Sequence, residues 1–285
     1  MARIGVAAAL VILFAAIAVT PVSAGAAPPL PTLIYEVDAV FERFYPYRSY
    51  LVISPMRVEG RYIYFNVTYL LGEPVRIRDV YFIRPYNATS IVIKVDAETW
   101  EAYYGALDLG NFLFIGLHKA SRPLSSLEDG RVVYWSVVNV TLIGVVDEEG
   151  YWIPAAPVKL PRRIRAPQAY IDVARALGLR VLEVYSMRLR GPGVASCRMT
   201  FEGHSGILLS AFISEMGVVE VVGGKLPAYT NVTIFRLLGI KAIEIFISLA
   251  HVTPGETSVP ITKAVEIDPT PAIPAASKRG LPIPI

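Results

Sequence analysis

The sequence predicts a mainly β fold, built as one or two antiparallel β-sandwich-like units. Long stretches alternate between apolar and polar side chains, and glycine, proline and acidic residues separate these stretches at short intervals. Helical spacing of apolar residues occurs in only two places, near 167–178 and, less regularly, near 97–107. Hydrophobic residues make up 54% of the 285, so the chain can bury a large core.

The N-terminus indicates export. Arg3 is the only charged residue before an apolar run at 4–19, and the small residues up to Ala24 suit cleavage after it. A retained membrane anchor is the rival interpretation, but the run is short for a bilayer span and no basic cluster follows it. We therefore expect a removed signal peptide at 1–24, then a proline-rich segment at 25–32, and a secreted protein without a stable membrane anchor.

The first strand is expected directly after that segment, because alternate positions of 33–41 share one apolar face. A helix is the other interpretation, since Ile34, Val37, Phe41 and Phe44 fit its period. As a strand, the segment either pairs within its own sheet or adds to the open edge of a neighbouring copy, which builds a fibre. The inward-facing residues of this assembly strand are Leu33, Tyr35, Val37, Ala39 and Phe41.

The rest of the first half reads as strands and turns. Residues 61–69 form a predicted strand whose odd-numbered side chains from 63 onward face the core, which places Asn66 on the opposite face. Residues 72–74 read as a turn into a strand at 75–84. For the second, less regular helix at 97–107, Asp96 can cap the first turn. A hairpin is expected at 131–146 and 151–158, around an acidic turn at 147–150.

A proline-bounded basic linker at 161–166 is the expected boundary between a β-rich domain at 33–160 and a second one at 167–268. The second domain opens with a helix, because Pro167 suits the first helical position and Gly178 suits the C-terminal cap. Its strands are predicted at 180–190, 196–202, 207–213, 218–222, 231–237, 242–252 and 259–267, before an extended proline-rich tail at 269–285.

Four of the five asparagines head an Asn-X-Thr triplet, and only Asn111 does not. Coincidence would produce such triplets far less often, so asparagine is kept here mainly as an acceptor of N-linked sugar. Such sugar is added outside the cytosol, which agrees with the predicted signal peptide. The predicted glycosylation sites, all expected to face solvent, are Asn66, Asn87, Asn139 and Asn231.

Composition indicates the habitat. Gln168 is the only glutamine and Cys197 the only cysteine, so an intrachain disulfide is impossible. Low Asn, Gln, Cys and Met contents are typical of proteins from hot environments, and an exported protein of a hyperthermophilic archaeon fits them. The net charge of +3 comes without a long basic run, which argues against nucleic acid as a partner.

No catalytic, metal or cofactor motif is predicted. The histidines lie too far apart for a zinc motif. Cys197 and His204 are also widely spaced for a copper site, so a buried structural thiol is the better interpretation of Cys197. The segment 203–206 resembles the nucleophile segment of chymotrypsin-like serine proteases, but Ile207 replaces a glycine of that family. A tight turn between two strands is the simpler interpretation. Whether the acidic turn at 147–150 binds calcium stays open.

The expected function is structural. The residues indicate a secreted, N-glycosylated surface protein, a subunit of an extracellular filament, sheath or surface layer, whose partners are copies of itself or other surface proteins. In layout, the chain is similar to archaeal fibre subunits with a cleaved export signal. The alternative is an extracellular module that binds a sugar, peptide or metal ion, and a secreted hydrolase ranks third. The tyrosines that suit sugar stacking are Tyr45, Tyr47, Tyr50, Tyr62, Tyr64, Tyr103 and Tyr104.

Overall fold

The computed structural model describes residues 30–39, 48–77, 80–156, 163–215, 218–221, 224–227 and 230–253. Strands dominate this part of the chain, which confirms the mainly β prediction, and it has two α-helices. The expected signal peptide at 1–24, the tail at 269–285 and the strand at 259–267 lie outside the described residues. The helices are α1 (Gln168–Ala176) and α2 (Thr233–Leu237), with a 3-10 turn η1 (Leu117–Lys119).

Thirteen strands form one antiparallel sheet, in the order β11-β10-β9-β12-β13-β14-β17-β1-β2-β3-β4-β5-β6. Two short hairpins, β7 with β8 and β15 with β16, stand outside it. The strands of the large sheet are β1 (Thr32–Ala39), β2 (Arg48–Glu59), β3 (Tyr62–Ile77), β4 (Val80–Asp96), β5 (Glu101–Tyr104), β6 (Leu107–Asn111), β9 (Ser136–Val146), β10 (Tyr151–Pro154), β11 (Ile164–Arg165), β12 (Leu182–Arg190), β13 (Ser196–Glu202), β14 (Leu208–Ser214) and β17 (Glu244–Thr253). Those of the short hairpins are β7 (Ser125–Glu128), β8 (Arg131–Tyr134), β15 (Val218–Val221) and β16 (Gly224–Pro227).

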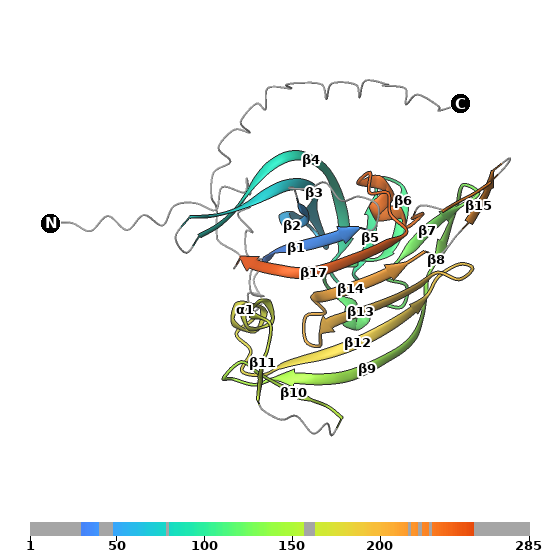
Figure 1. Ribbon diagram of the computed structural model, residues 1–285. Helices are drawn as coiled ribbons and strands as arrows, with labels where there is room; N and C mark the ends of the chain where they lie inside the picture. The colour runs from blue at the N-terminus through green and yellow to red at the C-terminus, as the bar shows by residue number, and fades with distance from the viewer. Residues whose placement is uncertain are drawn as a thin grey trace, which may run out of the picture.

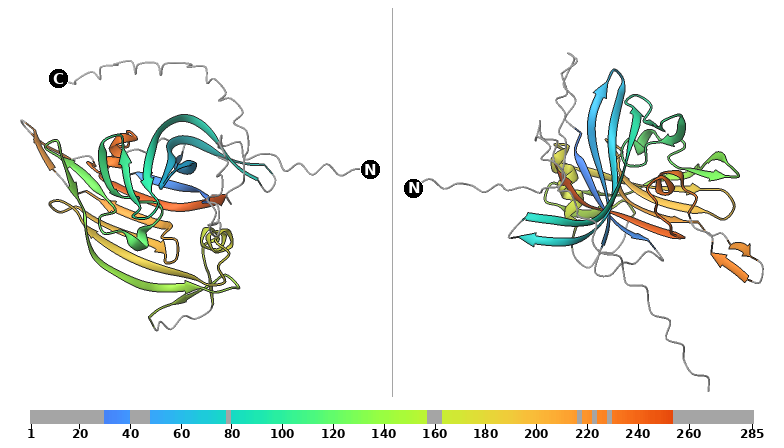
Figure 2. Two further views of the ribbon diagram at one scale, coloured as in Figure 1. Left: turned by 180° about the vertical axis from the view of Figure 1, so that it is seen from behind. Right: turned by 90° about the horizontal axis from the view of Figure 1, so that it is seen from above.

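The sheet curves strongly around its apolar face. β1 and β17 lie side by side in its middle, with β2 to β6 bending away on one side and β14, β13, β12 and β9 on the other (Figure 1). The two views of Figure 2 show the same curvature from behind and from above. A single hydrophobic cluster contains residues from both sides. One curled sheet therefore buries its inner face much as the two sheets of a sandwich do.

The segment after β6 passes through this core. Phe112 and Phe114 are fully buried, and their ring centroids lie 5.4 Å apart. Phe112 also contacts Phe65 of β3 at 4.7 Å, while Phe114 contacts Tyr35 of β1 at 5.5 Å. The hydroxyl of Tyr35 donates a 2.9 Å hydrogen bond to the carbonyl of Leu208. This aromatic group joins the two sides of the sheet across its inner face.

β1 has neighbours along both edges. Leu33 lies opposite Val252 of β17 on one side and Ile53 of β2 on the other. The strand interpretation is confirmed for residues 32–39, where Leu33, Tyr35, Val37 and Ala39 are buried as expected. Phe41 lies outside the described residues. Both edges of β1 pair within the chain, which agrees with the alternative of intramolecular pairing. Donation to a neighbouring copy stays a prediction.

The expected boundary at 161–166 does not separate two sheets. β9 and β10 come before it in the chain and β11 and β12 after it, yet β9 pairs with β12 and β10 pairs with β11. At the middle of the sheet, β17 pairs with β1. Each half supplies strands that fill the open edges of the other. The expectation of two β-rich units joined by a linker is therefore corrected to one continuous sheet.

Three local predictions were wrong. Residues 72–74 are not a turn: β3 continues to Ile77, and Gly72 takes up a register shift against β4. Residues 97–107 are not helical, because Trp100 has a left-handed φ of 59° and the chain then forms the β5–β6 hairpin. Residues 231–237 contain α2 instead of a strand, since Ile234, Phe235 and Leu238 are buried at helical spacing.

Other local predictions are confirmed. α1 spans Gln168–Ala176 after Pro167, and Gly178 follows with a left-handed φ of 66°. The buried Ala169 and Val173 belong to its apolar side, and the helix packs against β17 and β12. The acidic turn at 147–150 joins β9 to β10, whose Trp152 lies opposite Val146. Asp147 closes that turn by accepting a 2.8 Å hydrogen bond from the backbone N–H of Tyr151.

Candidate functional site

The asparagines divide into two kinds by what their side-chain amides do. Asn111 is only 6% exposed, and its amide Nδ2 donates to the carbonyl of Thr99 at 3.1 Å. Its Oδ1 accepts from the backbone N–H groups of Ser121, at 3.1 Å, and Arg122, at 3.0 Å. By contrast, the amides of Asn66, Asn87 and Asn231 make no hydrogen bond with the described residues. That of Asn139 meets only its own triplet partner: Thr141 Oγ1 donates to its Oδ1 at 3.2 Å.

The four triplet asparagines all lie at the surface. Asn87, Asn139 and Asn231 are exposed, and Asn66 is half-buried on the outer face of β3. That face was expected for Asn66, and its neighbours Phe65 and Val67 are fully buried on the inner side. The side chains are thus placed where an attached sugar would extend into solvent.

The threonines of the triplets differ more than the asparagines do. Thr89 and Thr141 are exposed, and Thr68 is half-buried with its Oγ1 2.8 Å from Ser90 Oγ. Thr233 is fully buried at the start of α2, and its hydroxyl has no partner among the described residues. A transferase that must engage the threonine hydroxyl could reach it at Asn87 and Asn139 in the folded chain, but not at Asn231.

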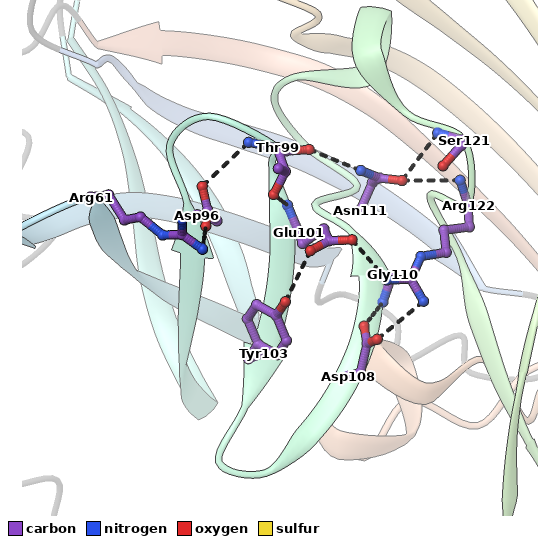
Figure 3. Close-up of polar contacts among 10 residues, drawn as sticks. All are labelled: Arg61, Asp96, Thr99, Glu101, Tyr103, Asp108, Gly110, Asn111, Ser121 and Arg122. Atoms are coloured by element: carbon purple, nitrogen blue, oxygen red, sulfur yellow. Dashed lines mark hydrogen bonds and ion pairs between the residues drawn. The ribbon is translucent and has the colours of Figure 1, made fainter.

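Asn111 belongs to a polar network that ties the core-crossing segment to the β5–β6 hairpin (Figure 3). Arg122 is its main cation: its guanidinium contacts Glu101 at 2.9 Å and Asp108 at 3.1 Å. The same guanidinium lies 4.4 Å from the ring centroid of Tyr134. Burial alone would raise the pKa of Asp108, but hydrogen bonds from Gly110 and Tyr134 and the charge of Arg122 hold it below its ordinary value.

A second part of Figure 3 anchors the turn before β5. The buried Asp96 accepts from the backbone N–H groups of Glu98 at 2.9 Å and Thr99 at 3.3 Å, and pairs with Arg61 at 2.7 Å. The predicted capping role of Asp96 is therefore present, although it caps a turn and not a helix. Each carboxylate in the network faces a cation or a backbone donor, which indicates a structural role for the group.

The protease-like segment forms a turn between β13 and β14. The buried Glu202 accepts from the backbone N–H of His204 at 2.5 Å and from that of Ser205 at 2.6 Å. Ser205 Oγ donates to the same carboxylate at 2.5 Å and accepts from the N–H of Ile207 at 3.3 Å. The hydroxyl thus both donates and accepts inside the turn, and it donates to a carboxylate where a catalytic serine would donate to an imidazole.

The remaining residues considered for metal binding or reactivity are Cys197 and the acidic turn at 147–150, and their contacts are those of structural residues. Among the described residues, no group of three or more His, Cys, Asp or Glu side chains could hold a metal ion. Cys197 is buried, and desolvation raises the pKa of its thiol well above the ordinary value. At the tip of the β9–β10 turn, Asp147 bonds to the backbone and Glu149 pairs with Arg163 at 2.9 Å.

Three of the tyrosines expected to suit sugar binding share the outer face of β3 and β5. Lys94 lies 4.7 Å from the ring centroid of Tyr62 and 5.2 Å from that of Tyr103, and Arg57 lies 4.4 Å from that of Tyr64. The chain's own cations therefore occupy these rings. Tyr50 is fully buried and Tyr104 exposed, while Tyr45 and Tyr47 lie outside the described residues.

Sequence reasoning missed the network of Asn111 and Arg122, which depends on a loop path that no local pattern encodes. One signal was available, since Asn111 is the exception in a chain that otherwise keeps asparagine for triplets. Within the described residues, no helix is long and apolar enough to cross a membrane. No protein-family model, curated protein or solved structure matches the chain.

Proposed function

We propose that the protein is a secreted, N-glycosylated structural component of a cell surface, a subunit of an extracellular filament, sheath or surface layer. The observation that carries the proposal is the division of the asparagines. The one outside a triplet has its amide hydrogen-bonded in the interior. The four inside triplets lie at the surface, where, among the described residues, the only side-chain hydrogen bond to their amides comes from Thr141 within the triplet of Asn139. Sugar attachment gives these four surface asparagines a role.

The architecture is compatible with a mechanical role. A single sheet of thirteen strands with one apolar cluster holds both ends of the described chain through β1 and β17. Cys197 is the only cysteine, so stability rests on packing and hydrogen bonds and not on disulfides. The partners under this proposal are copies of the chain or other surface proteins.

Two measurements on material from the native source test the proposal. Glycopeptide mass spectrometry should find sugar on the triplet asparagines and none on Asn111, which serves as the internal control. Electron microscopy with a specific antibody should locate the protein in filaments, sheath or surface layer. Unmodified asparagines together with labelling inside the cell would refute the proposal.

A sugar-binding module is the second candidate, favoured by the outer-face row of Tyr62, Tyr64 and Tyr103. Binding would require a sugar to displace Arg57 and Lys94 from these rings. Titration calorimetry with surface polysaccharides, comparing the wild type with Tyr62→Ala plus Tyr64→Ala, decides between the candidates. Measurable binding that this double variant abolishes would support the module.

A further inference from the structure

One segment of β9 lies along an edge of the large sheet. Residues 136–142 pair with β12 on one side, from Ser136 opposite Arg190 to Leu142 opposite Tyr185. On the other side, β10 pairs only with residues 144–146. Within the described part of the chain, no strand continues that pairing toward Ser136. Among the described residues, the backbone N–H and C=O groups of 136–142 along this edge therefore have no partner strand.

The side chains of this segment favour such pairing. Val138, Val140 and Leu142 are 63%, 46% and 37% exposed, and residues 136–142 contain neither a charge nor a proline. Two register shifts against β12 bend the strand but leave these apolar side chains in solvent. An open, uncharged, apolar edge is the usual starting point for edge-to-edge association.

A second stretch of the same sheet also lacks a partner strand among the described residues, and its own residues discourage strand addition. Residues 54–59 of β2 extend beyond the pairing with β1, which ends at Ile53. They include Pro55, Arg57 and Glu59, and the register against β3 shifts between the first two. Proline, charge and a bulge are the devices that discourage strand addition. The segment of β9 has only the register shifts, together with one feature that β2 lacks, a glycosylation triplet.

We propose that an N-linked sugar on Asn139 shields this edge of β9 and prevents copies of the chain from pairing through it. Asn139 lies at the middle of residues 136–142, is exposed, and directly follows Val138, the most exposed apolar side chain of the segment. A hydrated sugar there obstructs a strand that approaches this edge. The inference rests on the proposed glycosylation and gives one of its sites a specific task.

The task matters most for a structural subunit, which meets other copies at high local concentration. Shielding β9 limits contacts to the intended assembly surface. Asn87 has a related position, because its stretch of β4 pairs with β3 alone while β5 pairs only with Lys94 and Val95. There, however, the exposed Pro85 also disfavours strand addition, so Asn139 gives the cleaner test.

The experiment compares full-length variants produced in a glycosylating host. Asn139→Gln and Thr141→Ala each remove the triplet, whereas Thr141→Ser keeps it and Asn231→Gln removes a triplet outside the large sheet. Glycopeptide mass spectrometry measures occupancy, circular dichroism checks folding, and light scattering after size exclusion gives the mass. We expect the first two variants to form dimers or larger species at concentrations where the wild type and both controls keep one mass.

Two further arms identify the surface involved. Enzymatic removal of sugar from the folded wild type should produce the same association without any substitution. Adding Val138→Lys to Asn139→Gln should restore the wild-type mass, because a lysine on the open edge replaces the missing protection. Association that the lysine does not relieve would place the contact elsewhere and overturn the inference.

The outcomes separate the two proposals. A wild type that carries sugar on Asn139, with an Asn139→Gln variant of unchanged mass, overturns the shielding role while glycosylation stands. A wild type without sugar on any triplet, in native material and in the glycosylating host, overturns the proposed function and the shielding role with it.

Discussion

Asn111 and Asn87 carry the same side chain in opposite surroundings, which makes them a matched pair for substitution. Asn111→Ala removes three hydrogen bonds between a buried side chain and the backbone, and we expect it to lower the free energy of unfolding by about 2–4 kcal/mol. Asn87→Ala, at an exposed position, should change it by less than about 0.5 kcal/mol. Denaturant unfolding of unglycosylated protein, followed by circular dichroism, measures both values. Equal losses would contradict the division of the asparagines.

Cys197 reports on the opening of the core. Its buried thiol has a raised pKa, so we expect thiol reagents to label it only when the chain unfolds. The raised pKa also makes stability depend on pH, because the folded state keeps the thiol proton to higher pH than the unfolded chain does. Below pH 9.0, the ordinary thiol value, this thiol does not change the free energy of unfolding. Above it, the free energy of unfolding declines as the unfolded chain ionises.

The corresponding measurement is thermal unfolding of the wild type and Cys197→Ala between neutral and alkaline pH. The variant loses packing at every pH, yet the stability difference between the two proteins should shrink above pH 9.0. Rapid labelling of the folded wild type at neutral pH would show that the thiol is not buried in solution.

At the scale of single residues, the sequence predicted features that depend only on nearby positions in the chain. The four triplets are local patterns, and the outward position of Asn66 follows from a strand whose alternation is equally local. The partners of Asn111 were not predictable, because Ser121 and Arg122 reach it through a segment that first crosses the core. The segment at 203–206 illustrates the same point, since its turn was predicted but the bonds from His204 and Ser205 to Glu202 were not.

Among the connecting elements, the segment after β6 depends on close approach at one glycine. Gly116 has a φ of 80°, and a Cβ there would lie 2.2 Å from Cγ of Trp100. We expect Gly116→Ala to cost about 2–4 kcal/mol, because backbone strain adds to a clash with a large ring. Thermal and denaturant unfolding measure this cost.

Gly105 provides the control for that substitution. Its φ of 58° is similar, but a Cβ there would meet nothing within 4 Å. Gly105→Ala should therefore cost only the strain of the left-handed conformation, on the order of 1 kcal/mol. If the two substitutions were equally costly, the contact between Gly116 and Trp100 would have no energetic weight.

The elements that were predicted correctly carry their signal within one segment. α1 has Pro167 before it and Gly178 after it, and β1 alternates between buried and more exposed side chains from Tyr35 to Ala39. The wrong prediction at 72–74 concerns a segment whose structure depends on a partner strand. Gly72 was expected to turn the chain, but β4 continues alongside β3 past it, so the glycine accommodates a register shift. Which of these outcomes a glycine adopts is decided by pairing that only the complete sheet supplies.

For the molecule as a whole, the continuous sheet predicts that its halves do not fold separately. Residues 30–156 lack the strands β12 and β17 that cover β9 and β1, and residues 163–253 lack β1 and β9 in turn. We expect each fragment alone to show weak near-ultraviolet circular dichroism and no cooperative unfolding, and the two together to recover both. Cooperative unfolding of either fragment by itself would restore the two-unit organisation that the sequence indicated.

The pairing of β1 with β17 also determines when folding can finish. Leu33 lies opposite Val252, so the middle of the sheet joins nearly the first described residue to the last. Long-range pairing of this kind is slow to form. In an exported chain, it cannot form before almost the entire polypeptide has emerged. Until that moment the sheet is incomplete, and the hydroxyl of Thr233, later enclosed, is still accessible. If the chain is exported and glycosylated as proposed, the pairing of β1 with β17 sets the time window in which Asn231 can be modified.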